Sequence, residues 1–397
     1  MRQRFVVSGR ARTLLAAAAC LIGIGYLAVT LARQDVDGRD FRYIWLAGQF
    51  WREGLDPYGT EFMRRGRELF PIGHPPMFVW TYPPSMWPIA VSIASIPPAP
   101  AFTIWKLLTF GAVLLAVFSR MAARHAPAAT SWAIMLALAY ACSLSATAGA
   151  LRTGQPVILA FCGAGLACWG IDRRSVIAMG IGAALLMLKP QIGIPFCVGL
   201  LFVQRGLLAL AFGAVMSLLA AAPAAPSWVS YPASTAAGHA AEHYYGFGYN
   251  SPAAMTGLPH LVWRVTKYRI GLLTSVAIAS GAVVAACAWH RRSKRSLSTE
   301  SFAAITALST ALFVNLHVYD LILVLLALPA MRATHGGGRV LVVVGLLLLW
   351  RVENTLTLLG LYSMANTATA ASLAVTFLLA GCCYAVVRPS SGPGNAR

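Results

Sequence analysis

The 397-residue chain is 58% hydrophobic and only 11% charged, and its mean hydropathy is +0.68. Because a soluble domain carries about 25% charged residues, this composition excludes an ordinary soluble protein and predicts a polytopic membrane protein. The net charge of +19 does not indicate nucleic-acid binding, since the basic residues are dispersed between apolar runs. We attribute them to connections beside the anionic cytoplasmic face of a membrane.

The chain starts with a basic segment followed by a long apolar run that continues to Ala32. A cleaved signal peptide has a shorter apolar core of roughly 7–15 residues, so we expect an uncleaved first membrane helix. The eight cysteines all fall within apolar runs and lack zinc-like CxxC spacing. They are interpreted as small buried hydrophobes, without a disulfide framework or a metal site.

Apolar runs predict an all-α polytopic fold with about 12 transmembrane helices, each needing about 20 residues. The expected spans are residues 13–32, 99–119, 131–149, 156–171, 174–189, 191–204, 207–223, 270–289, 301–315, 319–331, 339–360 and 369–387. The sequence "LKPQIGIP" at the junction of two of them also allows a kinked re-entrant pair. We interpret residues 1–397 as a single membrane-embedded domain.

Placing the N-terminus in the cytoplasm makes the cytoplasmic connections basic, as the positive-inside rule requires. Two long extracytoplasmic loops then follow, at residues 33–98 and 224–269, and a cytoplasmic tail at residues 388–397. Only Asp172 and Glu300, of twelve acidic residues, fall on the cytoplasmic side. This asymmetry favours a functional extracytoplasmic surface in the plasma (inner) membrane of the cell.

Residues 33–98 contain six of the twelve acids between Asp37 and Glu68, beside many aromatic residues. Apolar residues from Phe41 to Leu55 recur at spacings of three and four, which predicts an amphipathic helix lying on the membrane with its aromatic side chains in lipid. Asp40 stands just before that helix, where it suits either an N-cap or a general base. Downstream, prolines predict a short element over 86–97 and a rigid corner at Tyr82.

Polar residues next to apolar runs form three further groups, and such residues near the hydrocarbon are functional candidates. Arg152 and Gln155 lie in "LRTGQPV", and Lys189 lies in "LMLKPQ". The third group, in "FVNLHVYDLIL", consists of Asn315, His317, Tyr319 and Asp320. Snorkelling or helix capping is the alternative explanation for each group.

The second loop, with "HAAEHYYGFGYNSPAAMTGLP", combines aromatic rings with amide and hydroxyl groups, a composition that suits sugar binding. Its candidates are Tyr249 and Asn250. His239, Glu242 and His243 are considered as zinc ligands, but no HExxH motif is present. We therefore expect no metal.

The chain resembles glycosyltransferase family 87, within the C-type membrane glycosyltransferase superfamily. The motifs that carry the resemblance occur in the expected order over roughly residues 13–335. They are "DFRYIWLAGQFWREGLDPY", "TYPPSMWPIAVSIASIPPAPAFTIW", "GQPVILAFCGAGLACWG" with "MGIGAALLMLKPQIGIP", "SPAAMTGLP" and "NLHVYDLILVLLALP".

The resemblance implies a C-type glycosyltransferase fold and an inverting transfer of a hexose, with mannose the leading candidate. The donor would be a polyprenyl-phosphate sugar, and the acceptor a hydroxyl of a glycolipid or glycan on the extracytoplasmic face. Such a reaction needs one carboxylate base, which maps to Asp40, and no cofactor. His317, Lys189 and Arg152 are expected to bind the donor phosphate.

Other residues are expected to contact the sugar substrates or the surrounding lipid-linked groups. They are Asp37, Tyr43, Tyr58, Tyr82, Gln155, Tyr249, Asn250, Asn315, Tyr319 and Asp320. A lipid or solute transporter, such as a flippase, is the main alternative function, followed by a non-catalytic scaffold. A transporter, however, should place its charges at the midplane between repeated halves.

Overall fold

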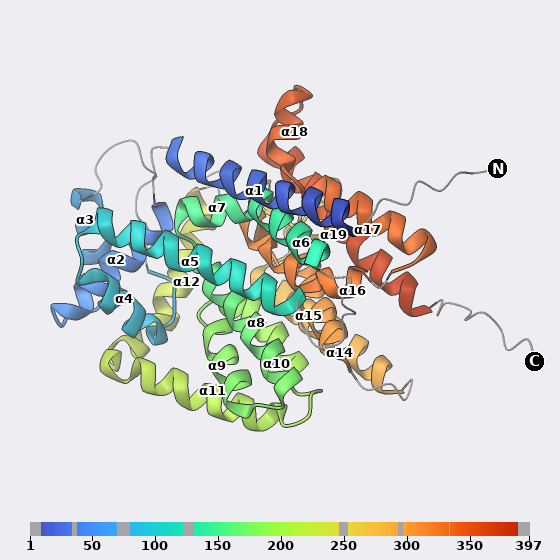
Figure 1. Ribbon diagram of the computed structural model, residues 1–397. Coiled ribbons are helices and arrows are strands. Elements are labelled where there is room, and N and C mark those ends of the chain that lie inside the picture. Colours follow the sequence, from blue (N-terminus) through green and yellow to red (C-terminus); the bar gives the residue numbers. More distant parts are fainter. Residues whose placement is uncertain are drawn as a thin grey trace, which may run out of the picture.

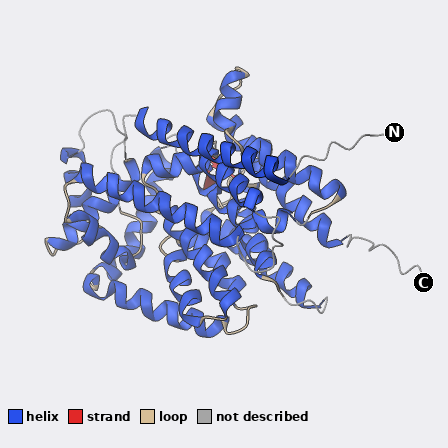
Figure 2. Cartoon of the chain, in the orientation of Figure 1, coloured by secondary structure: helices blue, strands red, loops and turns tan. Residues whose placement is uncertain are grey.

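A computed structural model describes residues 9–33, 38–69, 80–121, 131–245, 253–292, 297–332 and 334–387. Most of these residues are helical, and loops and one pair of two-residue strands connect or join the helices (Figure 2). Strand β1 (Met255–Thr256) pairs antiparallel with β2 (Leu316–His317), with Met255 opposite His317. The prediction of an all-α membrane protein is therefore confirmed at this level.

The helices follow one another along the chain as labelled in Figure 1. In the N-terminal half they are α1 (Gly9–Arg33), α2 (Arg39–Arg52), α3 (Thr60–Leu69), η1 (Pro84–Met86), α4 (Trp87–Ala94), α5 (Pro98–Met121), α6 (Ser131–Ser143), α7 (Ser145–Thr153), α8 (Val157–Arg173), α9 (Val176–Leu186) and α10 (Pro190–Leu200). In the C-terminal half they are α11 (Gly206–Ala221), η2 (Ala222–Ala224), α12 (Ser227–Tyr245), α13 (Leu258–Thr266), α14 (Leu272–Arg292), α15 (Thr299–Phe313), η3 (Val318–Ala327), α16 (Leu328–Arg332), α17 (Gly336–Leu349), α18 (Val352–Leu358) and α19 (Met364–Val387).

Five helices in the described ranges are long and apolar enough to cross a membrane: α1, α5, α11 (with η2), α14 and α19. Two bent pairs, α6 with α7 and α17 with α18, raise the number to seven if each pair is one span. The predicted count of about twelve is not confirmed. The physical reason is that several apolar runs fold as short buried elements and not as continuous spans.

Helices α9 and α10 illustrate this difference, because each has 11 residues and is about 16 Å long. A hydrocarbon core is about 30 Å thick, so neither helix crosses it alone. Ser175 caps α9 by accepting a hydrogen bond from the Ala178 N–H, and Pro190 begins α10. Lys189 lies between them, which agrees with the kinked pair allowed by the sequence.

The expected span over 319–331 is instead the ten-residue 3-10 helix η3 followed by the short α16. Residues 320–327 of η3 are all buried inside the protein and not exposed to lipid. Runs of 3-10 helix longer than 3–4 residues are uncommon. Here the element passes through the core beside α7, α8 and α15 and carries Asp320 in its first turn.

Helices α2, α3 and α4 gather at one end of the molecule, whereas the start of α1 and the end of α19 lie at the other (Figure 1). These three helices belong to the first predicted loop and form their own apolar cluster with α5 and Leu188. The cluster is packed around Phe41, Phe50, Phe62 and Trp80. It positions α2 against the rest of the bundle.

Candidate active site

Helix α2 carries Asp40 in its first turn, one residue after the helix begins at Arg39. Gly38 is the N-cap residue, in the left-handed conformation with φ 50°, and no side chain caps the helix. The possibility that Asp40 itself is the N-cap is therefore wrong. The carboxylate is left available for other partners.

The aromatic face of α2 points into the protein and not into lipid, which corrects the prediction of a helix lying on the membrane. Phe41, Ile44 and Phe50 are at most 2% exposed. The Phe41 ring lies 5.0 Å from that of Phe102 and 5.9 Å from that of Trp105, both on α5. The helical periodicity was correct, but the apolar stripe covers protein because α3, α4 and α5 surround it.

Two glycines allow α2 to approach its neighbours closely. Gly154 ends α7 with φ +72°, and a Cβ atom there would lie 2.5 Å from the Cβ of Phe41. A Cβ atom on Gly48 would lie 2.0 Å from the carbonyl oxygen of Ala90 on α4. These contacts leave no room for a methyl group, and they bring the start of α2 beside the end of α7.

Thr153 at the end of α7 and Gln155 just after it are the side-chain hydrogen-bond partners that favour the ionised form of Asp40. The Thr153 hydroxyl also donates a hydrogen bond of 3.0 Å to the Gly149 carbonyl. Burial raises the pKa of the Asp40 carboxyl group to about 6, although nearby Lys189 and the side chains of Gln155 and Thr153 oppose the rise. The charge of Asp320 adds a small increase. A carboxylate with a pKa near 6 is ionised at neutral pH and still accepts a proton readily.

Lys189 forms a buried ion pair with Asp320, and the two side chains are 6% and 2% exposed. The Lys189 amine also lies 5.3 Å from the centroid of the Tyr319 ring. Asp320 accepts a hydrogen bond of 3.2 Å from the backbone N–H of His317, and the His317 side chain accepts one from the Asp320 backbone. The rings of His317 and Tyr319 stack 4.8 Å apart. This connected group lies within electrostatic range of Asp40.

Tyr82 lies within electrostatic range of Asp40 and is held in the corner predicted from its prolines. The Tyr58 hydroxyl donates a hydrogen bond to the Tyr82 carbonyl, and the Trp80 ring lies 4.9 Å from the Tyr82 ring. Burial, together with the charges of Asp40 and Asp320, raises the pKa of the Tyr82 hydroxyl well above its ordinary value. That hydroxyl therefore stays protonated and can act as a hydrogen-bond donor.

The other described acids of this segment have structural partners. Glu53 pairs with Arg65 at 2.5 Å, and Asp56 accepts a hydrogen bond of 2.8 Å from Ser227. Glu61 and Glu68 pair with Arg64 along α3. Asp40 differs from them because it is surrounded by Gln155, Thr153, Tyr82 and a lysine that already has its own carboxylate.

The remaining predicted residues are distributed around this site. Tyr43 packs its ring 6.1 Å from Phe62, and Tyr58 is buried. Arg152 is exposed in the last turn of α7. The Asn315 amide donates to the carbonyl of Ile270 at 2.7 Å, which ties β2 to the start of α14. Contacts of these four residues with substrate stay predictions.

Three predicted site residues, Asp37, Tyr249 and Asn250, lie outside the described residues, as do the side chains of the considered zinc ligands His239, Glu242 and His243. Within the described ranges, no group of three His, Cys, Asp or Glu side chains is arranged to hold a metal ion. The sequence reasoning missed Thr153, although it is two residues before Gln155 in the motif that was singled out.

The sequence profile of glycosyltransferase family 87 matches residues 80–317, which is more than half of the chain. The chain belongs to glycosyltransferase family 87. No curated protein matches it. As a family 87 member it is a membrane glycosyltransferase, and the matched region contains Tyr82, Gln155, Lys189 and His317. It begins after Asp40, so the assignment of this residue depends on the geometry.

Proposed function

We propose that this glycosyltransferase moves a hexose, with mannose the leading candidate, from a polyprenyl-phosphate donor to a hydroxyl of a glycolipid or glycan. The observation that carries the proposal is the setting of Asp40, which is a carboxylate with a pKa near 6, fixed by Gln155 and Thr153. Transfer with inversion needs one such base, whereas a retaining mechanism needs a second carboxylate as nucleophile.

The proposed reaction is a direct displacement at the anomeric carbon. The acceptor oxygen forms a new bond to that carbon as the bond from carbon to the phosphate oxygen breaks. The acceptor proton passes to Asp40, and the bonding electrons leave with the lipid phosphate. Asp40 therefore has to lie on the side of the sugar opposite the leaving phosphate.

The leaving phosphate gains negative charge during this step, so a positive environment accelerates it. We assign this stabilisation to Lys189 and His317, with Arg152 as a further contributor. Lys189 shares its charge with Asp320. Lys189 therefore stabilises the phosphate as one member of a buried ion pair, beside the stacked rings of Tyr319 and His317, and not as an isolated cation.

The reaction is assigned to the extracytoplasmic face of the plasma membrane. Arg173 and Arg174 precede α9 and Arg205 follows α10, so all three lie at the ends of the two helices that are opposite Lys189. Because Lys and Arg accumulate in cytoplasmic connections, this arrangement supports a hairpin whose Lys189 turn points away from the cytoplasm. Cysteine labelling of residue 205 from each side of sealed vesicles tests the orientation.

The decisive experiment measures hexose transfer from a polyprenyl-phosphate hexose in membranes that contain the full chain. Asp40→Asn keeps the shape of the side chain but removes the base, so we expect a loss of at least about 100-fold in rate. Asp56→Asn is the matched control, since its remaining oxygen can still accept the hydrogen bond from Ser227. Near-normal transfer by the Asp40→Asn variant would disprove the assignment of the base.

The acceptor is identified by mass spectrometry of lipids and glycans from a strain that lacks this protein. The expected result is an envelope glycolipid or glycan shortened by one hexose. Restoring the intact gene, but not the Asp40→Asn variant, should return the missing sugar. An unchanged glycolipid and glycan profile would contradict the proposed acceptor class.

A further inference from the structure

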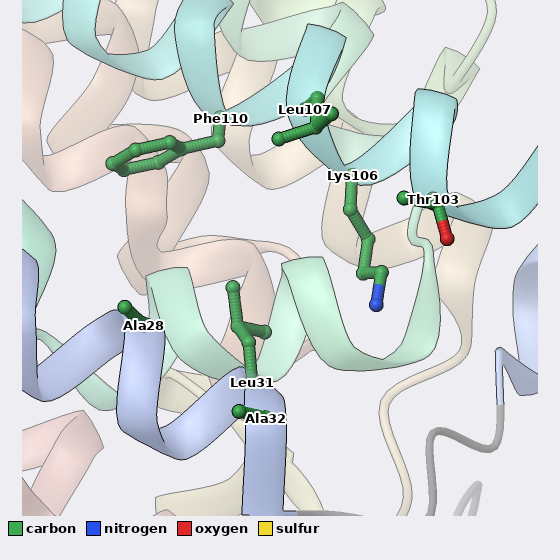
Figure 3. A pocket seen from close by; sticks show the side chains of 7 residues that line it. All are labelled: Ala28, Leu31, Ala32, Thr103, Lys106, Leu107 and Phe110. Carbon is green, nitrogen blue, oxygen red and sulfur yellow. The ribbon is translucent and has the colours of Figure 1, made fainter.

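A groove of about 260 Å³ runs between the end of α1 and the first half of α5 (Figure 3). Its walls are apolar, with Leu31 on α1 and Leu107 and Phe110 on α5. Leu107 is 66% exposed, so the groove opens toward the surroundings of the helix bundle. Because α1 and α5 are both long enough to span a membrane, the surroundings of this groove are lipid.

Lys106 is the single charged residue among those that line the groove, and its side chain extends from α5 toward the end of α1 (Figure 3). Its amine lies 4.8 Å from the centroid of the Phe102 ring. In the described part of the chain, no carboxylate lies within ion-pair distance of this amine. An ionisable residue inside an apolar span is costly and marks a functional site by default. Snorkelling explains the direction of the side chain, but not the cavity beside it.

The Phe102 ring connects this groove to the candidate active site. It lies against Phe41, the residue that follows Asp40, at 5.0 Å between ring centroids. A Cβ atom on Gly38 would lie 3.2 Å from the Phe102 ring, and one on Gly154 would lie 3.0 Å from it. The Phe102 ring therefore contacts Lys106 on one hand and two backbone segments near Asp40 on the other. These segments are the start of α2 and the end of α7.

We propose that this groove binds the polyprenyl chain of the lipid-linked donor and that Lys106 pairs with its phosphate as the donor enters from the bilayer, before the phosphate reaches Lys189 and His317 for the transfer. The inference rests on the proposed function, because it assigns a place to the donor of that reaction. An anionic head next to one long hydrocarbon chain is complementary to one amine at the border of an apolar groove. A groove between two helices accommodates one chain, whereas an ordinary phospholipid carries two.

The position of Lys106 complements that of Lys189. Lys189 is buried and already paired with Asp320, whereas Lys106 is partly exposed at a face that opens to lipid. The donor can therefore reach Lys106 from the bilayer, and the buried Phe102 ring separates Lys106 from the backbone beside Asp40. Lys106 is a binding residue in this proposal and does not take part in the proton transfer.

The first test measures binding of a polyprenyl monophosphate to the purified full-length protein by native mass spectrometry. Lys106→Gln should weaken binding about tenfold, the effect of losing one charge-assisted hydrogen bond. Ala28→Phe should weaken it similarly by filling the groove, because Ala28 lines its α1 wall. Polyprenol without phosphate should bind equally to the parent and to Lys106→Gln.

Two matched controls separate these effects from general damage. Lys267→Gln also removes an amine that lies over an aromatic ring, 5.0 Å from the centroid of Trp263, but lies outside the groove. Ala18→Phe adds the same ring at an exposed position of α1 that does not line the groove. Both variants should bind the polyprenyl monophosphate as tightly as the parent.

The second test compares the KM for the polyprenyl-phosphate hexose in the transfer assay. Lys106→Gln should raise this KM, with a smaller change in kcat. Unchanged binding and unchanged KM in both groove variants would overturn the groove assignment while leaving the proposed function intact. If binding weakens as expected but the parent transfers no sugar from this donor, the proposed function fails and the groove assignment stands. Preferential binding of phosphatidylglycerol at the groove would overturn the assignment of the donor.

Discussion

Lys189 and Asp320 are 131 residues apart in the chain and form an ion pair inside the protein. Lys189 lies at the tip of the hairpin formed by α9 and α10, and Asp320 lies in the first turn of the 3-10 helix η3. The pair joins two elements that are too short or too buried to be ordinary membrane spans. It also places a positive and a negative charge near Asp40.

Removing one member of this pair should destabilise the protein strongly. Lys189→Met leaves the Asp320 carboxylate buried without its partner, which costs about 3–5 kcal/mol in such pairs. Adding Asp320→Asn removes the unpaired charge, so the double variant should recover much of the lost stability. Thermal unfolding of the purified protein in detergent measures both effects.

Arg64→Ala is the control, because it breaks an exposed pair on α3 and should change the unfolding temperature little. Equal effects of Lys189→Met and Arg64→Ala would contradict the structural importance of the buried pair.

Activity should depend on pH through Asp40. Its pKa is about 6, and only the ionised carboxylate accepts the acceptor proton. The kcat/KM should therefore decrease about tenfold for each pH unit below about 6 and level off above it. Initial rates over pH 4–9 provide the measurement. A profile that is flat between pH 4 and 7 would exclude Asp40 as the base.

Thr153→Val should shift this profile toward higher pH. The Thr153 side chain favours the ionised form of Asp40, although its hydroxyl also donates a hydrogen bond of 3.0 Å to the Gly149 carbonyl. Removing the hydroxyl therefore raises the pKa of the Asp40 carboxyl group. Thr109→Val is the control, because the Thr109 hydroxyl makes the same kind of bond within its own helix, to the Trp105 carbonyl at 2.6 Å, but is not a partner of Asp40. The two pH profiles are compared at saturating and limiting donor. An unshifted acidic limb in Thr153→Val would mean that this hydroxyl does not position the base.

The ionisation of Asp40 should also reduce stability as pH rises. Its pKa is raised from an ordinary value of 3.8 to about 6 in the folded protein. Below about pH 4 the group is protonated in both the folded and the unfolded chain. Between pH 4 and 6 the unfolded carboxyl group ionises first, so folding stability is lost, and above 6 the loss is constant. Asp40→Asn should therefore unfold at a higher temperature than the parent at pH 7.5 and at a similar temperature near pH 4. A gain that is independent of pH would contradict this explanation.

Gly154→Ala should disturb both folding and transfer. The new methyl group would lie 2.5 Å from the Cβ of Phe41, and the backbone there has φ +72°. The left-handed conformation alone costs an alanine about 1–2 kcal/mol, and the contact would push the start of α2 away from Gln155. Gly59→Ala is the matched control, because a Cβ atom there meets nothing within 4 Å. Unfolding temperature and transfer rate are compared in both variants. Normal transfer by Gly154→Ala would show that this close approach is not needed.

Much of the site was predictable from residue types and their neighbours. The clustered polar residues in "LRTGQPV", "LMLKPQ" and "FVNLHVYDLIL" stood out because they interrupt apolar sequence, and Gln155, Lys189 and Asp320 do meet near Asp40. Thr153 and Phe102 were missed because an isolated threonine or phenylalanine within a helix is common. Only their contacts with Asp40 and Lys106 distinguish them from similar residues elsewhere in the chain.

The amino-acid sequence by itself determined that this protein is a helical membrane glycosyltransferase, because composition, basic connections and family motifs are properties of local sequence. Only the tertiary structure decided that the aromatic face of α2 packs on protein, that 318–327 is a buried 3-10 helix, and that Lys189 pairs with Asp320. Hydrophobicity requires that a segment leave water, but it does not distinguish burial in lipid from burial in protein. That distinction depends on partners that are distant in the chain.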